Sequence, residues 1–184
     1  MSSIVLSGDT SGTVTVAAPA VAGTNTATLP AATGTVMVSG NMPAFSAYMT
    51  NGNASQSVTS ATFTKVKIDT KEFDTANAFD TSTYRFTPLV AGYYQINGCL
   101  TVQATGGVTG AIISIYKNNA EFKRGNQLFY AATNNIDPIV SALIYLNGST
   151  DYIELYGYVV GASGTAIGVG STQTYFQASM VRAA

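Results

Sequence analysis

Side chains alternate with a period of two along several segments of this chain, and that period most constrains its fold. Within residues 92–98, Tyr94 and Ile96 fall on one side of an extended backbone, while Tyr93 and Gln95 fall on the other. Asp, Glu, Lys and Arg make up only 9% of the 184 residues, against a typical roughly 25%. Thr, Ser, Asn and Gly take the polar positions, and these residues suit strands and turns better than helices. We therefore predict an all-β chain with almost no helix.

Residues 151–160 carry apolar side chains on both faces of a predicted strand. Tyr152, Tyr156 and Tyr158 fall on one face, and the other face is mostly aliphatic. An antiparallel sandwich leaves one face of each sheet in water. The second apolar face is therefore expected to be covered by another subunit, or alternatively by the chain's own loops.

Residues 139–146 repeat this two-faced pattern. Val140 and Ile144 fall on one face, and Leu143 and Tyr145 fall on the other. The dipeptide Asn147-Gly148 follows this run and is a strong signal for a β-hairpin.

A fixed spacing of aromatic, acidic and glycine residues runs through the middle of the chain. The positions that keep it are Ile68, Asp74, Phe79, Phe86, Gly92, Tyr94 and Ile96. This spacing resembles the signature of complement-q-type globular heads, with Ile68 and Ile96 in place of Phe and Gly98 in place of an aromatic residue. Residues 44–47 look like the first strand of that family, and residues 174–180 look like its last.

The resemblance implies an antiparallel jelly-roll sandwich of the tumour-necrosis-factor and complement-q type over residues 44–184. It also implies a homotrimer, in which Tyr152, Tyr156 and Tyr158 would meet at the interface around a threefold axis. The implied core of the motif comprises Ile68, Phe79, Phe86, Gly92, Tyr94, Ile96 and Phe176.

Residues 1–38 differ in character from the rest of the chain. Asp9 is the only Asp, Glu, Lys or Arg before residue 65. Short strands are expected at residues 4–6 and 13–16, with further candidates at 27–29 and 35–38. A segment of this size cannot bury a core alone, so we expect a β-rich attachment segment whose three copies pack around an axis. Residues 39–43 are expected to form a hinge before the head.

A second resemblance covers this N-terminal segment. Residues 6–12, 18–19, 22–24 and 29–36 look like a segment found in structural proteins of tailed bacteriophages, where it precedes trimeric tips. The resemblance implies a virion protein assembled in the cytoplasm of a bacterial host.

The composition excludes several functions. The chain has no histidine, which removes His-based catalysis and the usual zinc sites. A net charge of -1 argues against nucleic-acid binding, and no apolar run reaches the roughly 20 residues that span a bilayer. The start of the sequence lacks the pattern of a signal peptide. We expect no cofactor, no metal ion, no membrane insertion and no enzymatic activity.

The acidic residues between 69 and 80 are expected to lie on a solvated strand and loop. Asp69, Glu72, Asp74 and Asp80 alternate there with lysines. A calcium site that uses Asp74 and Asp80 is the alternative, because hard cations take oxygen ligands. A depolymerase built on a carboxylate pair is a third class of function, but no acidic pair stands in an obviously buried setting.

The expected function is a trimeric capsid decoration protein at the virion surface. Its N-terminal segment would seat it on the major capsid protein or on other virion subunits, with the head projecting outward. The shortness of the segment before the head favours this role over a long-shafted fibre. The alternative is the tip of a tail fibre that recognises a host surface glycan or protein. Its candidate recognition loops are residues 106–107, 130–135 and 161–170.

Overall fold

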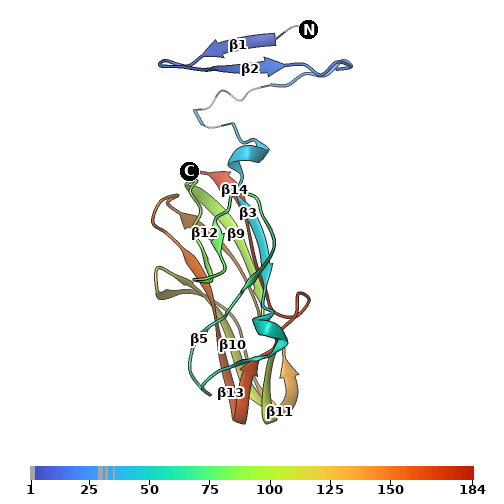
Figure 1. Cartoon of the computed structure of the whole chain (residues 1–184), viewed down its shortest axis with the longest axis vertical. Helices are drawn as coiled ribbons and strands as arrows, with labels where there is room; N and C mark the ends of the chain where they lie inside the picture. The colour runs from blue at the N-terminus through green and yellow to red at the C-terminus, as the bar shows by residue number, and fades with distance from the viewer. Residues whose placement is uncertain (1–2, 29–30, 32, 35) are drawn as a thin grey trace. The chain divides into compact units, whose positions relative to one another are not determined.

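The computed structural model describes residues 3–28, 31, 33–34 and 36–184 (Figure 1). The chain divides into two units, residues 1–34 and residues 35–184. We call them the N-terminal unit and the head, and each is described by itself.

A β-hairpin forms the regular part of the N-terminal unit. Strand β1 (Ser3–Ser7) pairs antiparallel with β2 (Thr13–Ala17), as the sequence predicts for residues 4–6 and 13–16. The candidate strands at 27–29 and 35–38 lie partly outside the described residues. Residues 27–28 and 36–38 are described and have no strand conformation, so the prediction is wrong there. A strand is held by its neighbours, and no described segment pairs with either stretch.

The head is built from strands and two short 3-10 helices. In chain order its elements are η1 (Ser39–Asn41), β3 (Ala44–Tyr48), η2 (Asn51–Asn53), β4 (Gln56–Ser57), β5 (Thr64–Lys65), β6 (Thr70–Asp74), β7 (Phe79–Asp80), β8 (Arg85–Phe86), β9 (Gly92–Cys99), β10 (Val102–Lys117), β11 (Ala120–Ile136), β12 (Ile139–Leu146), β13 (Ile153–Ile167) and β14 (Tyr175–Ala183). The residues predicted as a hinge, 39–43, form η1 and its exit. The Asn41 side chain closes this turn by accepting a hydrogen bond from the Val38 amide.

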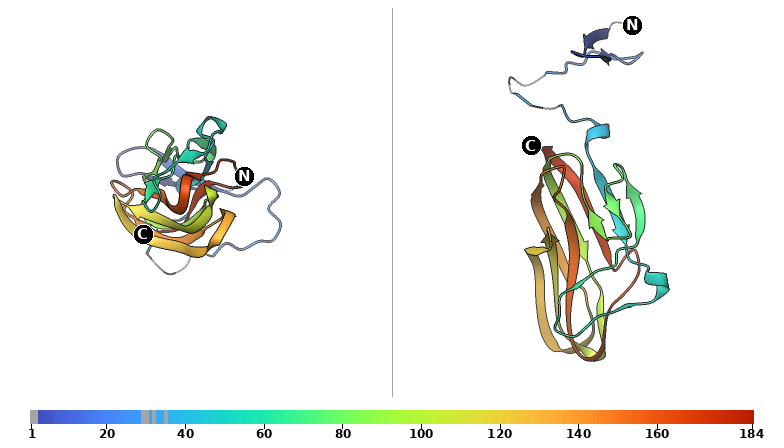
Figure 2. Two further views of the ribbon diagram at one scale, coloured as in Figure 1. Left: turned by 90° about the horizontal axis from the view of Figure 1, so that it is seen from below. Right: turned by 60° about the vertical axis from the view of Figure 1, so that its left-hand side comes forward.

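Two antiparallel sheets make the sandwich, and they stack face to face (Figure 2). Sheet I has the order β11-β10-β13-β8-β7, with β4 and β5 also paired to β13. Sheet II has the order β12-β9-β14-β3-β6. Non-consecutive strands are neighbours in both sheets, as in a jelly roll.

The core lies between the two sheets and follows from the period of two. In β9, Tyr94 and Ile96 are fully buried while Tyr93 is exposed, and in β13 Ile153, Leu155 and Val159 point into the core. Four aromatic rings form its centre: Phe45 stacks on Phe79 and Phe86 and meets Phe176 edge to face. Such rings stabilise the folded state through the large apolar area that they bury and through their offset and edge-to-face geometry.

The Asn147-Gly148 turn connects the two sheets and does not close a hairpin. Strand β12 pairs with β9 in sheet II, whereas β13 pairs with β10 in sheet I, so the hairpin prediction is wrong. The Asn147 Oδ1 accepts hydrogen bonds from the amides of Ser149, Thr150 and Asp151. This side-chain turn reverses the chain as a hairpin turn would. The strands on its two sides, β12 and β13, nevertheless belong to different sheets, because their apolar faces pack in opposite layers of the sandwich.

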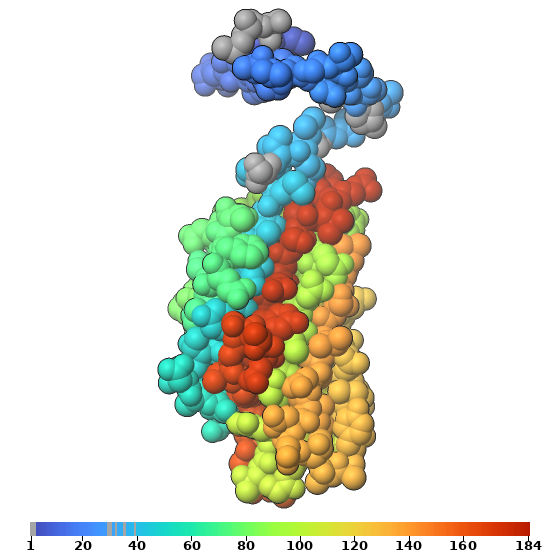
Figure 3. Space-filling view, turned by 90° about the vertical axis from the view of Figure 1, so that its right-hand side faces the viewer, coloured from blue at the N-terminus to red at the C-terminus, as the bar shows by residue number. Residues whose placement is uncertain are grey.

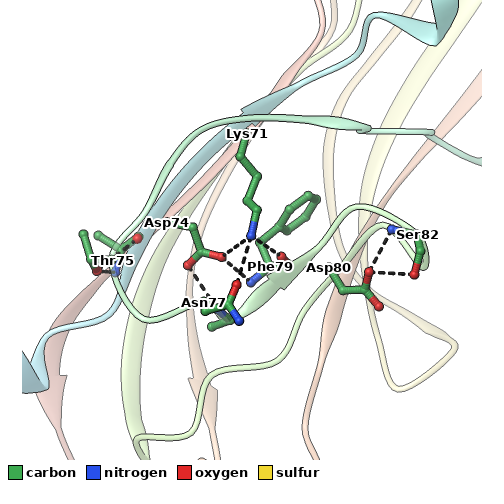
Figure 4. A network of polar contacts seen from close by, with 9 residues as sticks. Lys71, Asp74, Thr75, Asn77, Phe79, Asp80 and Ser82 are labelled. Atoms are coloured by element: carbon green, nitrogen blue, oxygen red, sulfur yellow. Dashed lines mark hydrogen bonds and ion pairs between the residues drawn. The ribbon is translucent and has the colours of Figure 1, made fainter.

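A polar network shapes the turn between β6 and β7 (Figure 4). Asp74 accepts hydrogen bonds from the amides of Ala78 and Phe79, and the Lys71 ammonium binds both Asp74 and the Phe79 carbonyl. Burial opposes the charge on Asp74, but these donors lower the pKa of its carboxyl group. The network therefore fixes the backbone at Phe79 and directs its ring into the core.

Candidate functional site

The tyrosines of the predicted interface lie on the outward face of sheet I. Tyr152, Tyr156 and Tyr158 are all partly buried within the single chain. Tyr156 stacks on Tyr116 with ring centroids 3.8 Å apart, and the centroid of the Phe63 ring lies 5.2 Å from that of Tyr158. Loop and neighbouring-strand residues of the same chain thus cover part of this face. A trimer interface at these three tyrosines stays a prediction.

An open apolar surface lies instead on β9 and β12 of sheet II and near the start of the adjacent edge strand β11. Figure 3 faces sheet II, with β14 in red, β9 in light green and β12 in orange. Tyr93 and Tyr145 are cross-strand partners whose ring centroids are 5.5 Å apart. We call the exposed side chains Tyr93, Phe122, Ile139, Leu143 and Tyr145 the apolar strip. The sequence pattern of residues 139–146 pointed to this surface through its second apolar face.

The residues of the spacing motif lie in or beside the core. Ile68, Phe79, Phe86, Tyr94, Ile96 and Phe176 are each at most 2% exposed. A Cβ at Gly92 would collide with the Arg182 carbonyl oxygen of β14, so the backbones approach too closely there for any side chain. Burial raises the pKa of Tyr94 to about 12, and its hydroxyl donates to the Val90 carbonyl. The motif residues have structural contacts and no open surface for a ligand.

The three segments predicted as recognition loops meet at one pocket of about 440 Å³. Gly106, Gly107, Asn134, Asn135 and Gly164 are among its lining residues. Residues 106–107 belong to β10, 130–135 to β11 and 161–167 to β13, so describing them as loops is wrong; residues 168–170 follow β13 and are not part of a strand.

The pocket exists because the ladders of β10 break at this point. Gly106 and Gly107 have φ values of 80° and 98°, a region that side-chain-bearing residues rarely adopt. The register of β10 with β11 shifts between Gln103 and Val108, and its register with β13 shifts over the same residues. Such bulges leave backbone groups unpaired and bend the strand. Together with the amides of Asn134 and Asn135, they give a polar, uncharged concavity.

The acidic residues between 69 and 80 do not converge on a metal site. Asp74 and Asp80 each bind donors of their own turn, as Figure 4 shows, and Asp69 accepts from the amides of Thr50 and Asn51. Asp69 and Asp74, predicted to be solvated, are therefore structural acceptors, and the prediction is wrong for both. In the described part of the chain, no group of three or more His, Cys, Asp and Glu residues is placed to hold a metal ion. Nor does that part contain a helix of the length and hydropathy needed to cross a membrane.

Fold and surface together define a jelly-roll head domain, and comparison with solved structures specifies its type. The globular domain of zebrafish complement 1qA matches with a TM-score of 0.56 and 16% identity, over 77% of this chain and 98% of that one. Murine APRIL matches with a TM-score of 0.55 and 8% identity, over 76% of this chain and 99% of that one. The Eiger TNF of S. frugiperda matches with a TM-score of 0.51 and 10% identity, over 77% and 95%.

The fold is therefore a C1q/TNF-like jelly roll, which confirms the fold predicted from the spacing motif. At these identities the likeness shows the fold alone. No protein-family model matches the chain, and no curated protein matches it.

Proposed function

We propose that this chain is a trimeric, non-enzymatic structural protein of a tailed bacteriophage, seated on the virion by its N-terminal unit. The observation that carries the proposal is an exposed aliphatic face on the hairpin of that unit. Ile4 pairs with Val16, and Leu6 pairs with Val14, so the four side chains share one face. Each is 57–65% exposed. An exposed apolar face of this kind marks a surface that another protein covers.

The scarcity of charged residues in the N-terminal unit supports a seat made by apolar burial. Asp9, in the turn of the hairpin, is the only Asp, Glu, Lys or Arg before residue 65. Docking would then depend on buried aliphatic area and on backbone pairing along the free edges of β1 and β2. The partners that suit this surface are the other copies of the chain and the major capsid protein or another virion subunit. The resemblance of residues 4–38 to tailed-phage structural proteins supports this class of partner.

Self-association of the head supports the trimer. The apolar strip holds three aromatic rings, and three copies around a closed axis would bury it without leaving an open end. A capsid position with threefold symmetry would match such a head.

Cryo-electron microscopy of intact particles tests the decoration role directly. Threefold density distributed over the capsid is the expected result, and density confined to the tail would overturn it.

A binding assay with particles that lack the protein adds a matched pair of variants. Val14→Asp, on the apolar face of the hairpin, should abolish incorporation, whereas Thr15→Asp, on the opposite face, should retain it.

A second candidate function, glycan recognition by a tail-fibre tip, is favoured by the polar pocket where three predicted segments meet. Its amides and unpaired backbone groups suit the hydroxyl groups of a neutral sugar. Selective binding on a glycan array that Asn135→Ala abolishes would support this role. Array binding that the substitution leaves unchanged would count against it.

A further inference from the structure

A different pocket in the head concentrates positive charge. It has a volume of about 390 Å³ and lies beside β5 and the turn before β8. Lys65, Lys67 and Arg85 line it, which is three of the eight Lys and Arg residues in the whole chain. In a protein with so few charges, this clustering needs a physical explanation.

A buried carboxylate organises two of the three cations. Glu154 is fully buried, and its Oε1 lies 2.7 Å from both the Lys65 Nζ and the Arg85 Nε. The hydrogen bond to Glu154 raises the pKa of Arg85 above its usual value. The Arg85 guanidinium also lies over the Tyr152 ring, 4.2 Å from its centroid. Both cations are thus held in place before any ligand arrives.

The third cation is positioned through the backbone. Gln56 is 4% exposed; its Nε2 donates to the Lys65 carbonyl, and its Oε1 accepts from the Lys67 amide. Lys65 and Lys67 therefore extend from the same side of one extended segment. Among the described residues, no acceptor binds the Lys67 ammonium, and Glu154 engages only the Nε of Arg85. Donors therefore remain free for an anion, because the Glu154 carboxylate binds only two of the three cations.

The residues that precede Arg85 in the pocket lining are suited to a sugar. Tyr84 lines it with a φ of 60°, a backbone conformation that is strained for an aromatic residue and is found at ligand sites. The hydroxyl groups of Ser82 and Thr83 donate to Asp80, which leaves their oxygens able to accept hydrogen bonds. These donors, from Ser82 first, lower the pKa of Asp80 to about 2. With Asp80 counted as well, positive charge still exceeds negative charge around the pocket.

We propose that this pocket binds an acidic saccharide. Lys67 and the terminal N–H groups of Arg85 hold its carboxylate or sulfate, Tyr84 contacts the sugar ring, and Ser82 and Thr83 accept hydrogen bonds from its hydroxyls. A guanidinium fork and an ammonium are the groups that recognise such anions best. The site is separate from the uncharged pocket between β10, β11 and β13, and it does not depend on the virion role.

Isothermal titration calorimetry on the full chain tests the proposal. The acidic probes are a hyaluronan tetrasaccharide and a chondroitin sulfate tetrasaccharide, and the neutral probe of equal length is chitotetraose. At least one acidic probe should bind at least tenfold more tightly than chitotetraose, with an affinity that falls as salt rises. Lys67→Gln should weaken that binding by about tenfold, the effect of one charge-assisted hydrogen bond.

The control is Lys123→Gln, which removes the same charge from an exposed position on β11. It should leave binding unchanged. Equal losses in the two variants would overturn the site, since only net charge would then matter. Failure of both acidic probes, or binding of inorganic phosphate and sulfate as tightly as the saccharides, would overturn the proposal of a saccharide ligand.

Discussion

At the scale of single residues, two carboxylates of this protein hold backbone segments together. Asp69 binds the backbone amides of Thr50 and Asn51, and Asp74 binds those of Ala78 and Phe79. The sequence alone suggested solvated carboxylates, because composition cannot show which backbone amides come within reach. An amide donor 19 residues away along the chain has no local sequence signal.

Asp74 gives the chain a predictable acid sensitivity. Burial opposes ionisation, but hydrogen bonds and Lys71 lower the folded-state pKa below 3.8, the value for an unperturbed carboxyl group. The stabilisation is therefore fully present above pH 3.8 and is lost as the pH falls from there through the folded-state pKa. Asp74→Asn should lower the free energy of unfolding at pH 7 by about 1–2 kcal/mol. It should also flatten the decline in stability below about pH 4.

Urea denaturation at a series of pH values measures both effects. Asp9→Asn, in the exposed turn of the N-terminal hairpin, is the matched control. It should leave the decline in the free energy of unfolding at acid pH unchanged. If the free energy of unfolding declines equally steeply at acid pH in Asp74→Asn and in the parent chain, Asp74 is not the source of that decline.

At the scale of elements, the two strands with two apolar faces have different surroundings. In β13, the outer tyrosines are partly covered by Phe63, Arg85 and the neighbouring strand. In β12, Leu143 and Tyr145 stay exposed. The sequence left open whether another subunit or the chain's own loops cover such a face. Within one chain, the loops cover part of β13 and leave the outer face of β12 open.

The turn between β12 and β13 depends on Gly148, which has a φ of 70°. A Cβ there would collide with the Ala91 amide nitrogen and would lie 2.7 Å from the Val90 carbonyl carbon. Gly148→Ala should lower the free energy of unfolding by about 2–4 kcal/mol, because strain at positive φ adds to the steric clash.

Gly52→Ala is the matched control for this substitution. Gly52 has a φ of 64°, but a Cβ there would meet nothing within 4 Å. Gly52→Ala should lower the free energy of unfolding by only about 1 kcal/mol, because it adds backbone strain at positive φ without a steric clash. Thermal or urea unfolding measures both variants, and equal losses would show that contact with residues 90–91 contributes nothing.

At the scale of the whole molecule, two surfaces compete as the trimer interface. One comprises Tyr152, Tyr156 and Tyr158 on sheet I, and the other is the apolar strip along sheet II. We expect the parent chain to be a trimer at micromolar concentration. Leu143→Asp should dissociate it, because a buried unpaired carboxylate costs about 3–5 kcal/mol. Because Tyr158 is already partly buried within its own chain, Tyr158→Asp should leave a trimer that forms through the apolar strip intact.

Sedimentation equilibrium distinguishes the two surfaces. Leu89→Asp is the matched control, since Leu89 is 76% exposed and lies outside the apolar strip. Dissociation by Tyr158→Asp alone would favour the tyrosine face of sheet I. A parent chain that is monomeric would contradict both assignments.

The period of two and the spacing from Ile68 to Ile96 were enough to determine the fold class of this protein. Alternation is a local property, because successive side chains of a strand must point to opposite faces, and a fixed spacing of core residues reflects where strands begin and end. The all-β architecture and the two N-terminal strands could therefore be predicted from the sequence, and the C1q/TNF-like jelly roll was implied by the resemblance of the spacing to complement-q heads.

Only the tertiary structure decided which strands pair, which apolar faces stay open and which polar groups meet. Asn147-Gly148 predicts a turn, but the layers on its two sides are chosen by contacts with β9 and β10. Lys65, Arg85 and Glu154 are up to 89 residues apart, and they meet because β5 and β8 both lie against β13. Pairing between distant strands depends on the packing of the whole core, so a sequence shows which faces are apolar but not what covers them.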